Sequence, residues 1–126
     1  IIKAQTFKET NGVLRFFENN NNINFKIKRV FNIIASKNSF RGNHAHKKCK
    51  QIFQCLLGKL CLELDNGYYT KKIILSSPNK LVLVENKVWT NQTYLNNENI
   101  LIVYCNRLYE KEDYIYDYQS LIQLNK

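Results

Sequence analysis

The two histidines of the chain, His44 and His46, lie within the segment Arg41-Gly42-Asn43-His44-Ala45-His46-Lys47-Lys48. Side chains two residues apart on an extended strand project from the same face, so both imidazoles should point one way and Ala45 the other. Such a pair can transfer protons near neutral pH, or it can supply half of a metal site. The alternative without a chemical role is a pair of solvated histidines on an exposed strand.

A metal site in a small β-barrel needs ligands beyond these two imidazoles. Barrels of the cupin type that bind a metal usually add a Glu four residues after the second His and a further His from a later strand. Lys50 stands at the position of that Glu, and Thr90 lies near the position of the later His. The sequence therefore predicts that no metal acts here, and we expect no other cofactor.

The composition is typical of one folded domain. A chain of 126 residues that is 44% hydrophobic can bury a core of its own, so we expect a single domain over residues 1–126. The absence of a long apolar run and of a signal-like start predicts no membrane contact and a cytoplasmic location. The four cysteines have no Cys-x-x-Cys spacing, and we expect them to be reduced and structural: Cys49, Cys55, Cys61 and Cys105.

The formal net charge of +9 is unevenly distributed along the chain. No acidic residue occurs between Glu18 and Glu63, whereas nine basic residues do: Lys26, Lys28, Arg29, Lys37, Arg41, Lys47, Lys48, Lys50 and Lys59. The resulting positive potential would attract nucleic acid, an anionic membrane or a small phosphorylated ligand. Aromatic residues are not interleaved with a basic stripe and no nucleic-acid-binding motif is present, which argues against nucleic acid. A solvated basic surface is the remaining alternative.

Short segments of strand-like composition, separated by turn signals, fill most of the chain. Asn66-Gly67 predicts a two-residue type I′ hairpin turn, and the run of asparagines at 19–22 predicts a loop. Arg29 falls on the apolar side of its predicted strand, where a charge needs an anionic partner. The predicted strands are 13–18, 25–34, 41–46, 51–57, 59–65, 68–75, 81–85, 93–95 and 99–105.

The spacing of the apolar residues changes only at the C-terminal end of the chain. Apolar residues recur at helical spacing from Lys111 to Leu124, which predicts one C-terminal helix. Many short strands followed by a single helix indicate an all-β protein, a cupin-type antiparallel jelly roll or β-barrel.

Several motifs together resemble the dTDP-sugar 3,4-ketoisomerases of the WxcM-like cupin family. They extend over nearly the whole chain: Ile27-Lys28-Arg29-Val30, Arg41-Gly42-x-His44-Ala45-His46-Lys47-Lys48, Gln51, Asp65-x-Gly67, Val88-Trp89 and Tyr109-x-x-Glu112-Asp113-Tyr114-Ile115. The resemblance implies a metal-free jelly-roll homodimer that exchanges its N-terminal strand between subunits. It also implies a reaction that moves the carbonyl of dTDP-4-keto-6-deoxyglucose from C4 to C3, toward the 3-amino-3,6-dideoxy sugars of bacterial surface glycans such as lipopolysaccharide.

Carried over by position, His44 and His46 would be the acid/base pair, with Arg41 beside them. Moving a ketone by one carbon requires removal of the C3 proton, an enediol intermediate and delivery of a proton to C4. Arg41 and Arg29 would stabilise the enediolate or bind the diphosphate. Trp89 would stack on thymine or sugar, or else belong to the core. Which imidazole acts as the base stays open.

The chain departs from the family pattern at several positions. Members typically carry a tyrosine where this chain has Phe31-Asn32, a Trp-His-Glu where it has Trp89-Thr90-Asn91, and an Arg-Gly where it has Asn11-Gly12. The tyrosines that could substitute spatially are Tyr94, Tyr104 and Tyr109. These departures keep two alternatives open, a non-catalytic nucleotide-sugar-binding cupin and a dTDP-sugar epimerase, and the galacto or gluco configuration of the product is open as well.

Overall fold

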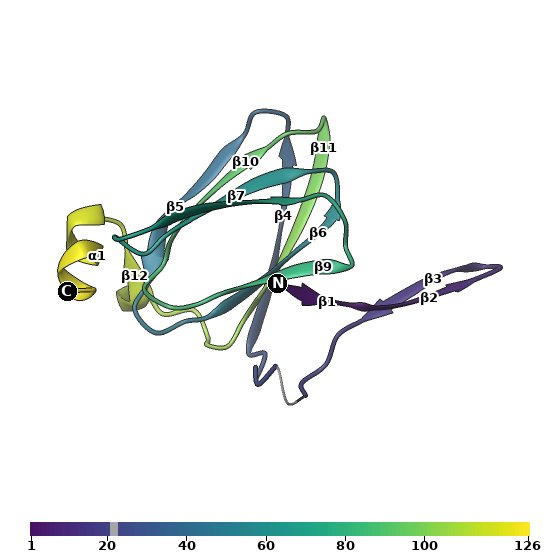
Figure 1. The fold of residues 1–126 in the computed structure, drawn as a ribbon, viewed down its shortest axis with the longest axis horizontal. Helices are drawn as coiled ribbons and strands as arrows, with labels where there is room; N and C mark the ends of the chain where they lie inside the picture. Colours follow the sequence, from purple (N-terminus) through teal and green to yellow (C-terminus); the bar gives the residue numbers. More distant parts are fainter. Residues whose placement is uncertain (21–22) are drawn as a thin grey trace.

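A computed structural model describes residues 1–20 and 23–126 and has two five-stranded antiparallel sheets that face each other (Figure 1). The first sheet has the order β1 (Ile2–Lys3), β9 (Lys80–Val84), β6 (Gln51–Leu57), β11 (Glu98–Cys105) and β4 (Arg29–Ser36). The second has the order β12 (Tyr114–Ile115), β5 (Phe40–His46), β10 (Trp89–Tyr94), β7 (Leu60–Asp65) and β8 (Thr70–Leu75). The all-β jelly roll with a C-terminal helix, α1 (Tyr118–Leu124), is confirmed.

The main core fills the space between the two sheets. Phe53 and Val103 from the first sheet meet Leu60, Leu62 and Leu75 from the second, and all five are at most 1% exposed. Each fully buried side chain of this size contributes about 1.5–3 kcal/mol relative to an exposed one. No helix in the described part of the chain is long and apolar enough to cross a membrane.

A separate hairpin, β2 (Gln5–Glu9) and β3 (Gly12–Phe16), extends away from the barrel in Figure 1. Phe7 and Phe16 stack across it, with ring centroids 6.0 Å apart. Among the residues that the structure describes, its two strands pair only with each other. The prediction of a strand at 13–18 located one half of this hairpin and missed the other.

Several predicted boundaries are wrong by a few residues. Strand β4 begins at Arg29 rather than at residue 25, and β10 begins at Trp89 rather than at residue 93. The hairpin at Asn66-Gly67 is confirmed, but Asp65 pairs with Thr70, so four residues and not two connect the strands. The predicted loop at 19–22 lies partly outside the described residues.

The prediction of one helix from Lys111 to Leu124 is wrong in its first half. A short 3₁₀ turn, η1 (Lys111–Asp113), is followed by β12, and α1 starts only after its N-cap, Asp117. Tyr114 pairs with His46 and Ile115 pairs with Ala45 at the edge of β5. Pairing with this open edge therefore outweighs the local helical spacing, and it brings the motif around Tyr114 to the histidines.

Candidate active site

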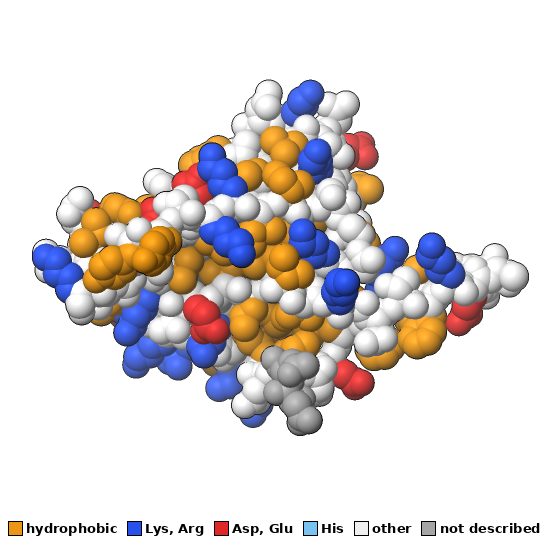
Figure 2. All heavy atoms as spheres, viewed as in Figure 1, with side chains coloured by type: hydrophobic (Ala, Val, Ile, Leu, Met, Phe, Trp, Pro, Cys, Tyr) orange, Lys and Arg blue, Asp and Glu red, His pale blue; other side chains and the backbone are white. Residues whose placement is uncertain are grey.

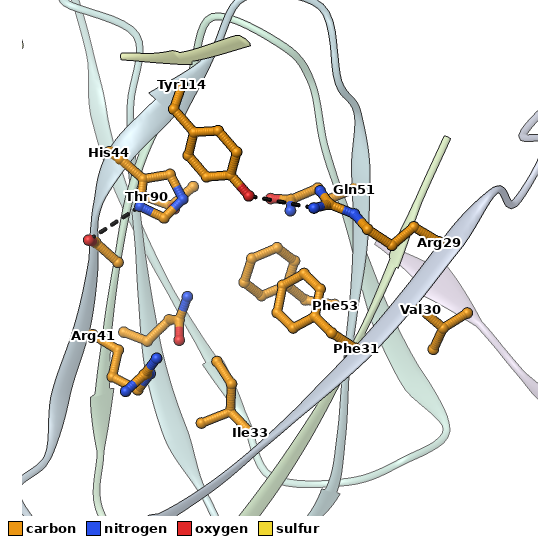
Figure 3. A pocket seen from close by; sticks show the side chains of 12 residues that line it. Arg29, Val30, Phe31, Ile33, Arg41, His44, Gln51, Phe53, Thr90 and Tyr114 are labelled. Carbon is orange, nitrogen blue, oxygen red and sulfur yellow. Dashed lines mark hydrogen bonds between the residues drawn. The ribbon is translucent and has the colours of Figure 1, made fainter. Parts of the chain in front are cut away.

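A pocket of about 380 Å³ opens at the end of the barrel where β4, β5, β6, β10 and β12 meet (Figure 3). Among the described residues its lining contains two arginines and no carboxylate, so its potential is positive. On the face shown in Figure 2, by contrast, lysines and arginines lie scattered over the barrel. The lining residues are Arg29, Val30, Phe31, Ile33, Arg41, Gly42, His44, Gln51, Phe53, Thr90, Gln92 and Tyr114.

A β-bulge in β5 aims two of the predicted site residues into this pocket. Thr90 pairs with His44 and Asn91 pairs with Gly42, so Asn43 is an extra residue in the ladder. Gly42 and Asn43 have positive φ angles of 98° and 64°. Arg41 and His44 are three residues apart and would face opposite sides of a regular strand; the bulge places both in the pocket lining.

Substituting Gly42 with alanine should destabilise the fold and misplace His44. A Cβ atom at Gly42 would lie 2.8 Å from the carbonyl oxygen of Thr90, in addition to the strain of a positive φ. We expect a loss of roughly 1–3 kcal/mol in the free energy of unfolding, measured by urea denaturation. Gly67→Ala is the matched control, because Gly67 also has a positive φ but its added Cβ would have only ordinary contacts. An equal loss of unfolding free energy in the two variants would show that the contact between the added Cβ and the Thr90 carbonyl has no effect of its own.

His44 presents a free basic nitrogen to the pocket. Its Nδ1 lies 3.1 Å from the carbonyl oxygen of Gly42, and since a carbonyl only accepts, Nδ1 carries the proton. The lone pair is therefore on Nε2. Burial lowers the pKa of His44 below its usual value of 6.5, so the ring is neutral at neutral pH. This tautomer suits a general base.

His46 lies directly behind His44 and is only 5% exposed. The two ring centroids are 5.2 Å apart, which confirms that both imidazoles are on one face of the strand. The Nδ1 of His46 donates to the Oδ2 of Asp113 at 3.1 Å, and its Nε2 has no hydrogen-bond partner among the residues that the structure describes. Burial and the neighbouring His44 lower the pKa of His46 to about 4, although Asp113 opposes this. His46 does not line the pocket and is held as a neutral ring.

Asp113 ties the C-terminal segment to the end of β5. Besides His46, its carboxylate accepts hydrogen bonds from the backbone amides of Lys48 at 2.7 Å and Cys49 at 3.3 Å. These three donors come from the residues that follow the bulge, so one buried carboxylate sets the orientation of the whole segment. The sequence reading included Asp113 only as part of a motif and assigned it no role.

Arg29 lies at the inner side of the pocket, where it meets Tyr114 and Cys105. Its Nη1 donates to the Tyr114 hydroxyl at 3.4 Å and its Nη2 to the Cys105 sulfur at 3.5 Å. Among the described residues no carboxylate pairs with Arg29, so in place of the expected anionic partner it has the Tyr114 hydroxyl and the Cys105 sulfur. The neighbouring Cys49 thiol, the Nε2 of Gln51, which donates to the Cys105 sulfur at 3.5 Å, and Arg29 lower the pKa of Cys105 below its usual value.

Arg41 is exposed at the pocket and forms no ion pair within the described parts of the chain. Trp89, in contrast, is buried in a cluster with Ala45, Ile115 and Leu121 beneath α1. It is absent from the pocket lining, so the structure places it in the core and not where it could stack on a ligand. The aromatic residue that the pocket does contain near the histidines is Tyr114, which the sequence reading did not select.

One group of potential metal ligands occurs among the described residues. Ligand atoms of His46, Cys49 and Asp113 lie within 4.8 Å of one another. Asp113 already binds His46 and two backbone amides, so a cation would have to displace these hydrogen bonds. Lys50, at the position where metal cupins carry Glu, forms an ion pair with Glu85 at 3.2 Å. The absence of a catalytic metal and of any cofactor remains a prediction.

The fold and the pocket define a cupin-type barrel with an imidazole in a positively charged cavity. Comparison with known proteins adds the family: residues 1–126 match the family described as FdtA, WxcM-like, C-terminal, and the chain belongs to it. A curated relative, the TDP-4-oxo-6-deoxy-alpha-D-glucose-3,4-oxoisomerase of Aneurinibacillus thermoaerophilus, is 40% identical over 79 residues. That match covers 62% of this chain and 57% of the relative, less than two thirds of its length.

Two solved structures are similar over almost the full chain. The 3,4-ketoisomerase from Helicobacter canadensis has a TM-score of 0.91 and 28% identity, covering 98% of this chain and 94% of the other. QdtA, a sugar 3,4-ketoisomerase from Thermoanaerobacterium thermosaccharolyticum solved in complex with TDP, has a TM-score of 0.91 and 30% identity, with coverages of 98% and 91%.

Proposed function

We propose that this chain is a 3,4-ketoisomerase that converts dTDP-4-keto-6-deoxyglucose to a dTDP-3-keto-6-deoxyhexose. The observation that carries the proposal is the neutral His44, whose free Nε2 belongs to a pocket with two guanidinium groups and no carboxylate. Membership of the FdtA family and the activities of the similar enzymes support the substrate class. The product would serve the synthesis of 3-amino-3,6-dideoxy sugars of surface glycans.

In this proposal His44 removes the proton from C3 of the sugar and later returns a proton to C4. The enediolate formed between these steps carries negative charge on oxygen, and Arg29 supplies a positive charge at the wall of the same pocket. Arg41, exposed at the pocket, is suited to bind the diphosphate, because its guanidinium fork matches phosphate oxygens.

His46 supports His44 from behind in this scheme. It is a positioning residue: its ring packs edge to face against His44, and its hydrogen bond to Asp113 fixes its tautomer. The sequence suggested that His44 and His46 form an acid/base pair. In this proposal His44 is the base and His46 is a buried ring that supports it. The proposal differs from the metal chemistry of other cupins in that the imidazole itself transfers the proton.

The test is incubation with dTDP-4-keto-6-deoxyglucose in D2O, followed by NMR. We expect deuterium at C3 of the remaining substrate and at C4 of a new 3-keto product. Tight dTDP binding without either signal would overturn the proposal in favour of a non-catalytic nucleotide-sugar-binding protein. Exchange at C5 as well as C3 would instead indicate an epimerase.

We further propose that the protein is a homodimer in which the β2–β3 hairpin packs against a second copy. Figure 2 shows some apolar side chains at the surface of this hairpin, among polar and charged groups, and Phe7, Val13 and Leu14 are each at least 50% exposed. Exposed apolar patches of this kind are rare on monomers. Light scattering should give the mass of a dimer for the wild type and of a monomer for the double variant Val13→Lys, Leu14→Lys. A monomeric wild type would contradict the proposal.

A further inference from the structure

Tyr114 brings a phenol hydroxyl into the pocket beside His44. It lines the pocket opposite Arg41 in Figure 3, and its ring lies against His46 at 4.4 Å and His44 at 5.2 Å between centroids. The hydroxyl points toward Arg29 and Gln51, away from the strand that carries it. The Tyr114 side chain therefore extends past His44 toward the guanidinium group of Arg29.

The rings of Tyr109 and Tyr116 lie beside Tyr114, but neither residue belongs to the pocket lining, and three further tyrosine hydroxyls are already engaged. Tyr94 donates to Gln92 at 2.8 Å and Tyr104 donates to Gln54 at 2.6 Å. Tyr118 donates to Asp65 at 2.8 Å. Within the described residues that line the pocket, Tyr114 supplies the only phenol. The Thr90 hydroxyl is also present there, but an aliphatic alcohol is a much weaker acid than a phenol.

Arg29 leaves the proton of the Tyr114 hydroxyl available. The guanidinium donates to the phenol oxygen, so the O–H of Tyr114 is free to donate into the pocket. Arg29 is itself fixed from the other side by Cys105 and stands over the ring of Tyr109 at 5.7 Å. A fixed positive charge next to a phenol oxygen stabilises the phenolate that forms during proton transfer.

We propose that Tyr114 is a catalytic residue that carries the proton between the C3 and C4 oxygens of the enediolate, with Arg29 stabilising the phenolate. This inference rests on the proposed 3,4-ketoisomerase activity. After His44 has taken the C3 proton, the C4 oxygen is negative and the C3 oxygen bears a hydrogen. Tyr114 gives its proton to the C4 oxygen and takes the proton from the C3 oxygen, so the phenol is regenerated. The C3 carbonyl then forms as His44 returns a proton to C4.

The experiment measures C3 exchange and product formation separately for Tyr114→Phe in D2O. Because His44 is intact in this variant, we expect deuterium to enter C3 at a rate within a few fold of the wild type. Formation of the 3-keto product should fall by about 10²-fold, the scale of one lost acid/base group. The ratio of exchange to product is a readout that a merely structural role of Tyr114 would not change.

Tyr116→Phe is the matched control, since Tyr116 stacks on Tyr114 at 5.7 Å but is 68% exposed and absent from the pocket lining. It should leave the ratio unchanged. Product formation at the wild-type rate in Tyr114→Phe would overturn the proposal, and so would equal losses of exchange and product. A wild type that shows no C3 exchange would instead refute the ketoisomerase activity itself.

Discussion

His44→Asn should lower turnover of dTDP-4-keto-6-deoxyglucose by about 10³-fold, within the range expected for loss of a general base. The asparagine amide can still donate to the Gly42 carbonyl, but it offers no basic nitrogen to the pocket. Arg41 and Arg29 are unchanged, so dTDP should bind with near wild-type affinity. Steady-state kinetics and calorimetric titration with dTDP measure the two quantities.

His46→Asn provides the comparison for this prediction. His46 is buried behind His44 and does not line the pocket, so its loss should slow the reaction less than the loss of His44. The reverse order, with C3 exchange retained in His44→Asn and lost in His46→Asn, would assign the base to His46.

The pH profile of the wild type follows from the same assignment. A general base must be neutral to accept a proton, and burial holds the pKa of His44 below 6.5. The rate should therefore be level from neutral pH down to about 6.5, the ordinary histidine value, and fall only at lower pH. The residual activity of His44→Asn should lack this acid limb.

The sequence was sufficient to predict the architecture and the face on which the histidines lie. The strand Gln51–Leu57 was predicted with its observed bounds from its β-rich composition, although its first five residues are all buried and do not alternate. Alternation along residues 25–34 matches the alternating burial of β4; it placed Arg29 on the inner side and predicted that Arg29 needs an anion. The sequence could not identify Cys105 as a partner, because it lies in an apolar strand like an ordinary core cysteine. Its sulfur accepts from Arg29 and Gln51 only in the folded structure.

Two features that form the pocket could not be predicted from the periodicity of the sequence. The bulge at Gly42-Asn43 depends on pairing with β10, and without it Arg41 and His44 would face opposite sides. The strand at Tyr114–Ile115 is too short to show a period, and the apolar residues around it suggested a helix. Tyr114 and Asp113 were therefore recognised only as part of a family motif and were assigned no role in the site.

Asp113→Ala should cost roughly 3 kcal/mol or more of unfolding free energy, because three donors lose a buried acceptor at once. Each buried donor without a partner costs about 1–3 kcal/mol. Chemical denaturation measures the loss. Asp117→Ala is the matched control: Asp117 caps α1 at the surface, and the loss of such a cap costs about 1 kcal/mol. Equal costs in the two variants would show that the Asp113 hydrogen bonds do not hold the segment.

Asp113→Asn separates the effect on His46 from the effect on the fold. The amide oxygen can still accept from the backbone of Lys48. The amide nitrogen stands in place of Oδ2, so it can face His46 only as a donor and no longer accepts from the Cys49 amide. The His46 ring must then accept at Nδ1 and move its proton to Nε2, the nitrogen that has no partner in the wild type. We expect ¹⁵N NMR to report this change of tautomer in a protein that remains folded. An unchanged tautomer would mean that Asp113 does not set the protonation of His46, and the base would be positioned by packing alone.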